Sequence, residues 1–462
     1  MEKLIAGVDS STQSVKIVVR KAISGELVAQ AKAPHPDGTE VDPESWWQAL
    51  QKVINEVGGL ENISVISIAG QQHGMVALDK NGQVIRPALL WNDTRSASDA
   101  ADLNSEIPDI SNEVGSALVA SFTASKVRWL AKNEVQNSQN VAAICLPHDY
   151  LSWRLSGSTD INDLVTDRSD ASGTGYFDGV KNIYVEKIFK LAHLSENNVY
   201  LPKVLSPNES SLKTKNGTLI GPGAGDNAAA ALGVGAQLGD VVVSLGTSGT
   251  AFSVSKTPTF DPSGEVAGFS DATGNFLPLV CTLNAARILD SANNILGTTF
   301  DELGQLALSA NPGADGLTLL PYFEGERTPN RPNATGVLSG LTLANSTKSN
   351  IARAMIEGML CGMVDAISSL EKEGVAINRV LLVGGGAKSE AVAKIASQLF
   401  GKEVLVPQPG EYVADGAAKQ AAWIATGKIP NWKLGEIKSY KEKATPEVVS
   451  KYRTLRDRTE NW

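Results

Sequence analysis

The sequence predicts an α/β protein made of two similar domains with a cleft between them. Runs with the spacing of strands alternate with runs with the spacing of helices, as in α/β folds. One pattern occurs twice: a strand, a turn of small polar residues and a second strand, at residues 3–21 and again at 239–255. The chain has 462 residues, more than one hydrophobic core usually serves. Together these observations predict a duplicated domain.

The first half, residues 1–236, opens with two strands, "KLIAGVDS" and "SVKIVVRK". A helix is expected next, with Asp42 as its N-cap and Pro43 at its first position. The run "ISVISIAG" predicts a buried strand, and a hairpin is expected to turn at Asn81-Gly82. This half therefore mixes strands and helices in one domain.

The second half, residues 237–462, repeats the opening pattern around the turn "GTSGT". The stretch "NRVLLVGGGAKSEAVAKIASQLF" predicts a buried strand that passes through a Gly-rich turn into a helix. The charged tail from about residue 429 is expected to be helical and to lie against the surface. No long linker separates the halves, so the boundary is placed just after the Gly-rich and Ala-rich stretch at 221–233.

Charge and cysteine content limit the function classes. The formal net charge is −9, which argues against nucleic acid as a partner but allows a small anionic ligand to meet local basic groups. The three cysteines have no metal-ligand spacing and are interpreted as buried thiols of a reducing compartment. The sequence shows neither a signal peptide nor a membrane span. We expect a soluble cytoplasmic protein without a membrane partner.

Three turns are rich in small residues of the types found in phosphate-binding loops. They are "DSSTQS" (9–14), "GTSGT" (246–250) and "GGGAKS" (384–389). Backbone amides and hydroxyls of such turns converge on anionic oxygens, and the third turn also precedes a helix start. None is a Walker motif. Taken singly, each can be only a tight turn, but three in a duplicated scaffold favour nucleotide binding.

Two carboxylates stand at strand or helix ends. Asp9 ends an apolar strand, where a carboxylate needs solvent or a cation, so Mg2+ is one expected partner and an Asx-turn is the structural alternative. Asp226 is the only charge in the stretch "GPGAGDNAAAALG". It is interpreted either as the N-cap of the helix that follows or as a catalytic base.

Two further loops combine polar and aromatic groups. "GQQHGMV" (70–76) contains His73, whose structural alternative is a hydrogen-bonded loop histidine. "WNDTRS" (91–96) offers an aromatic ring beside amide, carboxylate and hydroxyl groups, a composition that suits the wall of a sugar site. Its structural alternative is a helix start capped by Asp93 or Thr94.

These residues together resemble the FGGY family of carbohydrate kinases, which have the actin-like and hexokinase-like (ribonuclease H-like) ATPase fold. The resemblance runs from Ile5 to about Thr426. It includes "SFTASKVRWLAKN" (121–133) and "GVLSGLTLANSTKSNIARAMIE" (336–357) at the spacing of the family signatures. Within the family, "GQQHGMV", "LLWNDTRS" and "TDRSDASGTGYFD" are most similar to D-xylulose kinases.

The resemblance implies ATP-dependent phosphorylation of D-xylulose to D-xylulose 5-phosphate, with ATP and Mg2+ as cofactors. Asp226 is then the base that accepts the proton of the sugar hydroxyl, and Asp9 orients the hydrated Mg2+. The sugar is expected to contact Gln72, His73, Gly74, Met75, Trp91, Asp226 and Asn227. ATP is expected to contact Ser11, Thr12, Gly246, Thr247, Ser248, Gly384, Gly385 and Ala387.

Some positions depart from the family pattern. Ala391 stands where many relatives have an aromatic residue, and His148 replaces a frequent lysine before "DYL". His73-Gly74 stands where glycerol kinases carry Arg-Glu, which disfavours glycerol. Alternatives are a kinase for another ketose, polyol or sugar acid, such as L-xylulose, ribulose or gluconate. A more remote alternative is an actin-like nucleotide or sugar sensor without catalysis. The resemblance also allows a homodimer.

Overall fold

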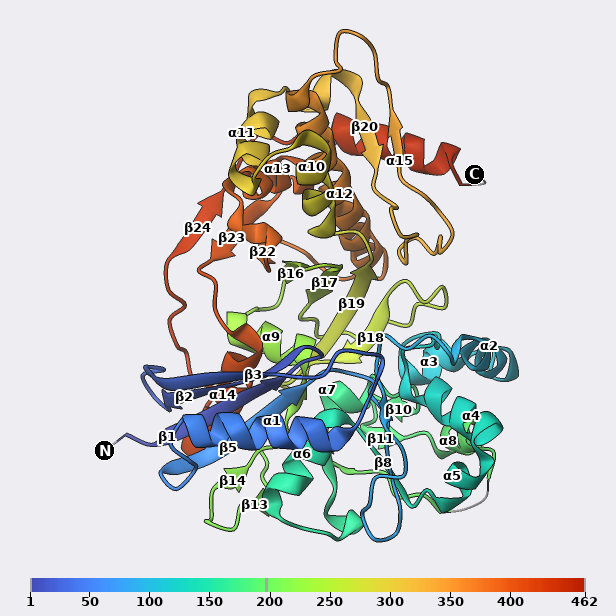
Figure 1. The fold of residues 1–462 in the computed structure, drawn as a ribbon, viewed down its shortest axis with the longest axis vertical. Helices are drawn as coiled ribbons and strands as arrows, with labels where there is room; N and C mark the ends of the chain where they lie inside the picture. Colours follow the sequence, from blue (N-terminus) through green and yellow to red (C-terminus); the bar gives the residue numbers. More distant parts are fainter. Residues whose placement is uncertain (1, 196–197, 461–462) are drawn as a thin grey trace. The chain divides into compact units, whose positions relative to one another are not determined.

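The computed structural model describes residues 2–195 and 198–460, and the chain folds into two compact units (Figure 1). Unit 1 contains the chain up to Gly235 together with Lys256–Leu277 and Glu411–Lys433. Unit 2 contains Ala236–Ser255, Pro278–Gly410 and the chain from Leu434 onward. The sequence predicts each half as one continuous segment. The structure differs in that two segments from the second half belong to unit 1.

A mixed sheet forms the centre of unit 1. Its strands follow the order β13-β14-β5-β1-β2-β3, and β15 also pairs with β5. β1 is antiparallel to β2 and parallel to β5, so the predicted opening hairpin is confirmed. The strands are β1 (Leu4–Ser10), β2 (Ser14–Lys21), β3 (Leu27–Pro34), β5 (Ile63–Gly70), β13 (Leu212–Lys213), β14 (Leu219–Ile220) and β15 (Ala224–Gly225).

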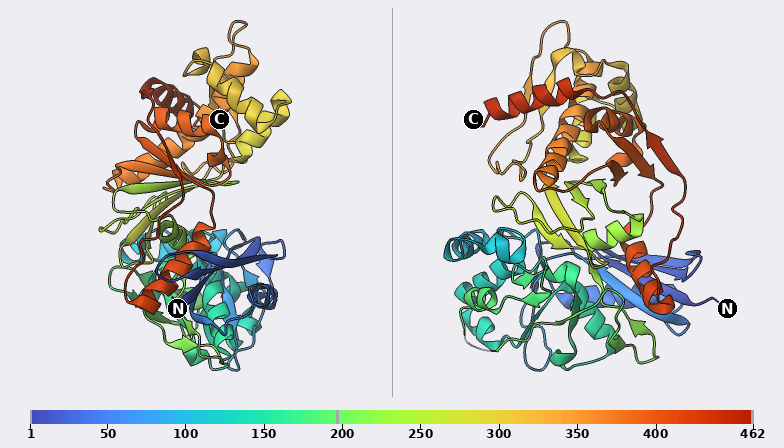
Figure 2. Two further views of the ribbon diagram at one scale, coloured as in Figure 1. Left: turned by 90° about the vertical axis from the view of Figure 1, so that its left-hand side faces the viewer. Right: turned by 180° about the vertical axis from the view of Figure 1, so that it is seen from behind.

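Helices α1 (Pro43–Glu56) and α14 (Tyr412–Thr426) cover opposite faces of this sheet (Figures 1 and 2). Asp42 caps α1 as predicted, because its side chain accepts the N–H of Glu44. The remaining helices and short strands of unit 1 surround these layers. They are β4 (Glu40–Val41), β6 (Val76–Leu78), β7 (Ala88–Leu89), α2 (Ala97–Glu106), α3 (Ile110–Val114), α4 (Thr123–Asn133), α5 (Val135–Asn140), β8 (Ala143–Cys145), α6 (Pro147–Ser156), β9 (Val165–Asp167), α7 (Arg168–Ala171), β10 (Phe177–Asp178), β11 (Ile183–Tyr184), α8 (Glu186–His193), β12 (Lys203–Leu205), α9 (Asp226–Val234) and β18 (Ala267–Ser270).

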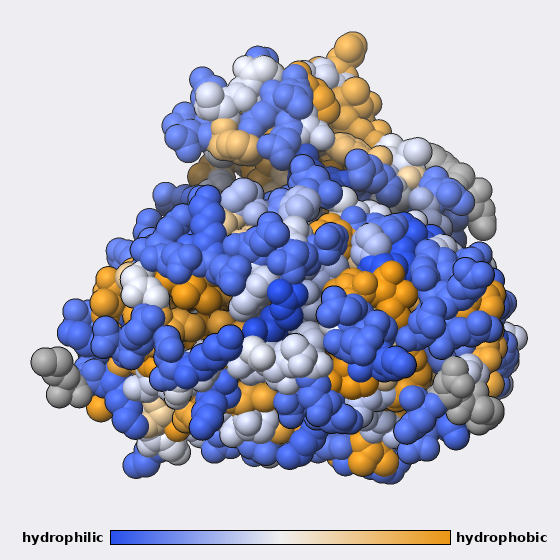
Figure 3. Space-filling model, turned by 60° about the horizontal axis from the view of Figure 1, so that its bottom comes forward, coloured by the Kyte–Doolittle hydropathy of each residue, from blue (hydrophilic) through white to orange (hydrophobic). Residues whose placement is uncertain are grey.

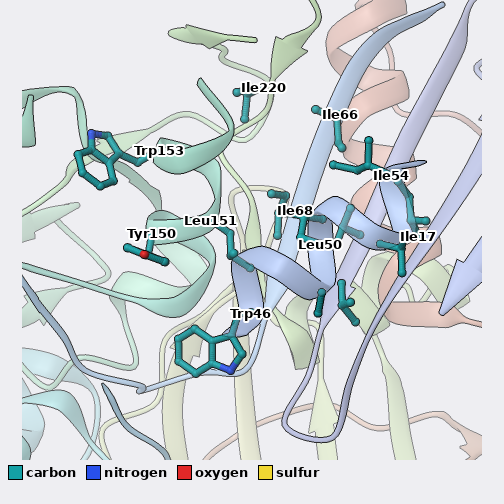
Figure 4. Close-up of a cluster of buried hydrophobic side chains, with 14 of the residues drawn as sticks. Ile17, Trp46, Leu50, Ile54, Ile66, Ile68, Tyr150, Leu151, Trp153 and Ile220 are labelled. Atoms are coloured by element: carbon teal, nitrogen blue, oxygen red, sulfur yellow. The ribbon is translucent and has the colours of Figure 1, made fainter. Parts of the chain in front are cut away.

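Alternate residues of β1 fill the two faces of the sheet. Val8 belongs to the apolar cluster that contains Trp46 and Leu50 of α1, shown in close-up in Figure 4. Ile5 belongs to a second cluster on the other face, built largely from alanines of α14, among them Ala418. Successive side chains of a strand point to opposite faces, so a strand buried on both sides reads as an unbroken apolar run.

Small residues let α14 approach its neighbours closely. A Cβ atom on Gly7 of β1 would lie 2.1 Å from the carbonyl oxygen of Ala414. A Cβ atom on Gly416 would lie 1.8 Å from the carbonyl oxygen of Ala229, on α9. The alanine run after Asp226 therefore forms a helix that packs backbone to backbone against α14.

Unit 2 repeats the strand arrangement of unit 1. Its sheet runs in the order β19-β17-β16-β22-β23-β24, with β16 antiparallel to β17 and parallel to β22. The pairings match those of β1 with β2 and β5, which confirms the predicted duplication. The elements are β16 (Asp240–Leu245), β17 (Gly249–Ser253), β19 (Phe276–Thr282), α10 (Arg287–Leu296), α11 (Phe300–Ser309), β20 (Thr318–Leu320), β21 (Val337–Ser339), α12 (Lys348–Lys372), β22 (Arg379–Val383), α13 (Glu390–Phe400), β23 (Glu403–Pro407), β24 (Ile437–Tyr440) and α15 (Pro446–Arg458).

The charged tail is only partly helical. α15 is the predicted helix, but β24 precedes it and extends the sheet through antiparallel pairing with β23. β24 is mostly exposed, so its residues lack the alternating apolar pattern that predicts a strand. The backbone pairing with β23 decides its conformation.

Hydrophilic residues predominate on the face of the molecule in Figure 3, and apolar residues lie there in separate patches. Among the described residues, no helix is long and apolar enough to cross a membrane. The cysteines Cys145 and Cys361 are buried as predicted, whereas Cys281 is only half-buried.

Replacing Gly416 by alanine is expected to lower the melting temperature by several degrees. Overpacking at a close contact typically costs about 1–3 kcal/mol, and here the new Cβ meets backbone that cannot rotate away. The matched control is Gly362→Ala on α12, where a Cβ meets nothing nearer than 3.9 Å. That change should be neutral or stabilise by up to about 1 kcal/mol. Thermal denaturation measures both, and equal behaviour of the two variants contradicts the prediction.

Candidate active site

Three parallel strands of unit 1 end at one edge of the sheet. In the registers of β1, β5 and β15, Ser10 and Gly225 both lie opposite Gly70. Asp9 precedes Ser10, and Asp226 follows Gly225. The loop after Gly70 carries Gln72 and His73, so residues far apart in the sequence meet where ligands bind in α/β folds.

Asp226 is the first residue of α9, not its N-cap. The cap position is Gly225, which has no side chain to offer, so the N-cap interpretation is wrong. The Asp226 carboxylate instead accepts the backbone N–H of Asn227 at 2.7 Å and its side-chain amide at 2.8 Å. Burial and the negative charge of Asp9 raise the pKa of Asp226 to about 7. A carboxyl group poised near neutral pH has the acidity expected of a general base.

Asp9 is almost fully buried at the end of β1. Its carboxylate accepts the hydroxyl of Ser11, and the Lys16 ammonium lies 3.8 Å away. Burial outweighs these favourable partners and raises the pKa of Asp9 to about 6. Two carboxyl groups with raised pKa values at one strand edge favour the approach of a cation.

Gln72 links the sugar loop to the base. Its side-chain oxygen accepts the Asn227 amide at 3.2 Å. A Cβ on Gly225 would lie 2.7 Å from the Gln72 amide nitrogen, so glycine is needed at that position. The stretch around Asp226 and the loop around His73 therefore form one packed surface.

His73 is a strained and firmly held residue. Its φ of 69° lies in the left-handed region, and its Nδ1 donates to the carbonyl oxygen of Gly173 at 2.6 Å. The ring packs against Phe122 and Phe269, with centroids 4.9 and 5.4 Å away, and these two phenylalanines also touch each other. Strained residues cluster at functional sites, and His73 has the predicted hydrogen bond and, in addition, contacts with two aromatic rings.

The two neighbours of His73 in the predicted sugar site have structural roles. A Cβ on Gly74 would lie 2.5 Å from the ring of Pro147. The N–H of Met75 donates to the carbonyl oxygen of Leu89 at 2.9 Å, and Met75 is buried. The Met75 amide N–H is thus already used within the protein, and the contact of the Met75 backbone with the sugar stays a prediction.

Trp91 is 39% exposed, and its indole N–H donates to the hydroxyl of Thr12 at 2.8 Å. This bond joins the predicted sugar wall to the predicted phosphate turn.

The helix expected at "WNDTRS" starts later, at Ala97, with Ser96 as its cap position. Asp93 instead accepts hydrogen bonds from Thr39 and Arg95, so neither predicted cap is correct.

The predicted nucleotide turns of unit 2 also lie side by side. Gly246, Thr247 and Ser248 form the turn between β16 and β17, and the Gly-rich turn follows β22, the parallel neighbour of β16. Gly384 has a φ of 93°, and a Cβ there would lie 2.7 Å from the carbonyl oxygen of Leu245. Gly385 has open space around it, and Ala387 is buried.

Sequence reasoning missed the groups that hold His73. Phe122 and Thr123 lie in the signature stretch at 121–133, and the Thr123 hydroxyl donates to the His73 carbonyl oxygen at 3.2 Å. Because this stretch matches a family signature, the sequence already marked these two residues as candidates for the site. Gly173 lies in the stretch "TDRSDASGTGYFD" that the resemblance singled out, whereas Phe269 carried no signal, because only the fold brings it to His73.

Comparisons with known proteins agree with this arrangement. Residues 4–235 match the N-terminal domain, and residues 241–425 the C-terminal domain, of the FGGY family of carbohydrate kinases. The chain is 41% identical over 442 residues to a xylulose kinase from Streptomyces coelicolor, covering 92% of this chain and 89% of that protein. It is 32% identical over 436 residues to a xylulose kinase from Escherichia coli, covering 90% and 89%.

Solved structures agree as well. The crystal structure of a xylulose kinase from Bifidobacterium adolescentis superposes with a TM-score of 0.93 and 45% identity, covering 98% of this chain and 99% of that one. This confirms the predicted class of duplicated, actin-like α/β ATPase domains. The chain therefore belongs to the FGGY family of carbohydrate kinases, enzymes that transfer a phosphoryl group from ATP to a sugar hydroxyl.

Proposed function

We propose that this kinase phosphorylates D-xylulose at its 5-hydroxyl group. The sugar oxygen attacks the γ-phosphorus of ATP, the bond from that phosphorus to the bridging oxygen breaks, and ADP leaves. The proton of the hydroxyl goes to Asp226. The observation that carries the choice of sugar is the match, at 41% and 45% identity over almost the whole chain, to proteins named xylulose kinase.

Asp226 is suited to the role of base by its place and its environment. It is half-buried at the strand edge, and its backbone and side-chain donors both come from Asn227. Such a base typically contributes about 10²- to 10⁴-fold to the rate. Gln72, His73 and Trp91 are the side chains that we assign to the sugar, together with Asn227, which also holds Gln72.

Mg2+ fits the oxygen donors near Asp9. This ion is usually held by one or two carboxylates, with waters and phosphate oxygens completing its shell. In the part of the chain that the structure describes, no group of three or more acidic, histidine or cysteine side chains is arranged to hold a metal ion. Asp9 is therefore assigned as the residue that orients hydrated Mg2+, which when bound neutralises phosphate charge.

The phosphate and nucleotide contacts are assigned to the turns of both units. In unit 1 they are Ser11 and Thr12, and the Thr12 hydroxyl is already oriented by Trp91. In unit 2 they are Gly246, Thr247, Ser248, Gly384, Gly385 and Ala387. The parallel register of β16 and β22 supports this assignment, because both turns leave the same edge of the sheet.

The pH dependence follows from the raised pKa of Asp226. Below a pH of about 7 its carboxyl group is protonated and cannot accept the hydroxyl proton. We expect kcat/KM for the sugar to fall about tenfold per pH unit below that value, and to be flat above it. A profile that stays flat down to pH 5 contradicts this assignment.

The substrate is tested by ADP release with ATP, Mg2+ and a panel of D-xylulose, L-xylulose, D-ribulose, L-ribulose, glycerol and gluconate. We expect kcat/KM for D-xylulose to exceed the others at least a hundredfold. Preference for another sugar contradicts the assignment of D-xylulose as the substrate but agrees with the kinase chemistry. Absence of any sugar-dependent ADP release contradicts the proposed function as a whole.

A further inference from the structure

Unit 1 contains a buried charged cluster that the proposed chemistry does not use. His148 on α6 is fully buried, and its Nε2 lies 3.3 Å from Asp149, 3.5 Å from Asp167 and 3.1 Å from Asp170. All three carboxylates are at most 2% exposed. A charged group in the interior is costly unless an opposite charge pairs with it, so the cluster depends on its one basic member.

The charge state of His148 is set by these neighbours. Burial alone would lower its pKa, but the three carboxylates outweigh burial and hold the pKa of His148 well above its usual value. The titratable groups that face the cluster are Asp149 on α6, Asp167 at the end of β9, Asp170 on α7, Cys145 on β8, Tyr176 before β10, Tyr184 on β11 and, on the side of Asp170, Asp226 on α9. Among these described groups, only His148 becomes a cation when it is protonated.

His148 lies directly beneath two strand ends of the active site. A Cβ on Gly223 would lie 2.4 Å from its Nδ1, and a Cβ on Gly70 would lie 3.0 Å from its Cβ. Gly223 stands three residues before the base Asp226, and Gly70 three residues before His73. The imidazole thus fills the space that Gly223 leaves open, and the Cβ and backbone of His148 lie against Gly70.

The carboxylates around His148 reach the same two loops. The backbone amide of His73 lies close enough to Asp170 to lower the pKa of that carboxyl group. The hydroxyl of Ser169, which precedes Asp170 on α7, accepts the N–H of Gly225 at 3.0 Å. Asp167 caps α7 by accepting the N–H groups of Ser169 and Asp170. We therefore expect a change in the charge of His148 to move α7, and with it the loops that carry His73 and Gly225.

We propose that protonated His148 is a positioning residue, which sets the base at Asp226 and the sugar ligand His73 by pairing with the carboxylates of α7. This inference rests on the proposed function. His148 touches no reacting atom. Its positive charge keeps Asp170 ionised, its ring supports Gly223 and its Cβ and backbone lie against Gly70, so the two loops keep their spacing.

Three variants test the role of the charge. We expect His148→Gln to lower kcat with the sugar at least 30-fold while the KM for ATP changes less than twofold. We expect His148→Lys, which restores a cation, to recover to within fivefold of the wild type. The double variant His148→Gln, Asp170→Asn should be at least tenfold more active than His148→Gln, because it leaves no unpaired charge at Asp170 and keeps an oxygen near the His73 amide.

The matched control is His193→Gln. His193 on α8 is also buried, at 2% exposed, and stacks on Phe189, and among the described residues burial and the backbone of Ser138, not a carboxylate, act on its pKa, which is lowered. We expect it to lose stability but to keep kcat within twofold. If His148→Gln is within threefold of the wild type, or if neither the lysine nor the double variant recovers activity although both fold, the proposal is overturned.

A spectroscopic measurement on the wild-type protein keeps the proposal testable even if His148→Gln does not fold. The chain has 4 histidines, so the ring signals of 15N-histidine-labelled protein are assigned by single substitutions. We expect the His148 ring to be an imidazolium at pH 7, where an unperturbed imidazole with a pKa of about 6.5 is mostly neutral. A neutral ring at pH 7 contradicts the proposal. All variants are assayed with the sugar that the wild type prefers, so an error in the substrate does not affect this test.

Discussion

Replacing Asp226 by asparagine is expected to lower kcat by 10²-fold or more while sugar binding is retained. The asparagine side chain keeps the size and the hydrogen-bonding oxygen but cannot accept the proton of the attacking hydroxyl. A general base typically contributes about 10²- to 10⁴-fold to the rate. Initial rates of ADP release measure the loss, and isothermal titration measures sugar binding. Turnover within tenfold of the wild type contradicts the base assignment.

The stability of Asp226→Asn shows whether its loss of activity comes from the missing base or from unfolding. Because the folded protein raises the pKa of Asp226 to about 7, the native state holds a proton that the unfolded chain releases near pH 4. The stability that this group contributes is therefore lost as the pH rises toward 7. We expect Asp226→Asn to be at least as stable as the wild type at pH 8. The control is Asp240→Asn, which loses the ion pair with Arg379 and should lower stability but not kcat.

Replacing Asp9 by asparagine is expected to lower kcat/KM about 100-fold and to raise the Mg2+ concentration needed for half-maximal activity. A neutral amide oxygen attracts a hydrated dication much less than a carboxylate does. The measurement is ADP release over a series of MgCl2 concentrations at fixed ATP. The same loss at every concentration, with an unchanged Mg2+ requirement, contradicts the role assigned to Asp9.

The matched control for Asp9 is Lys16→Met. Lys16 lies 3.8 Å from the Asp9 carboxylate but pairs more closely with Glu411, at 2.5 Å. Removing it leaves the carboxylate in place and takes away one positive charge. We expect less than a threefold change in kcat/KM. A loss as large as that of Asp9→Asn shows that the ion pair, rather than Mg2+, accounts for the effect.

Local sequence patterns predicted helices and strands well where a residue type is typical of a single position in the element. Asp42-Pro43 marked the start of α1, and the repeated strand pattern marked the hairpins of both units. The helix starts near Asp226 and Asp93 were misjudged by one to three residues. A cap differs from a first helical residue only in its backbone dihedral angles, and both positions favour Asp.

The sequence by itself determined the family and the duplicated α/β class, and it singled out the carboxylates and turns that we assign to the chemistry. These depend on residue types at short spacing. Only the tertiary structure decided that α14 returns to unit 1, that Phe269 and Gly173 hold His73, and that His148 lies beneath both active-site loops. Such contacts join residues that are far apart in the chain, and their strength comes from burial and charge pairing that exist only after the strands have paired and the helices have packed.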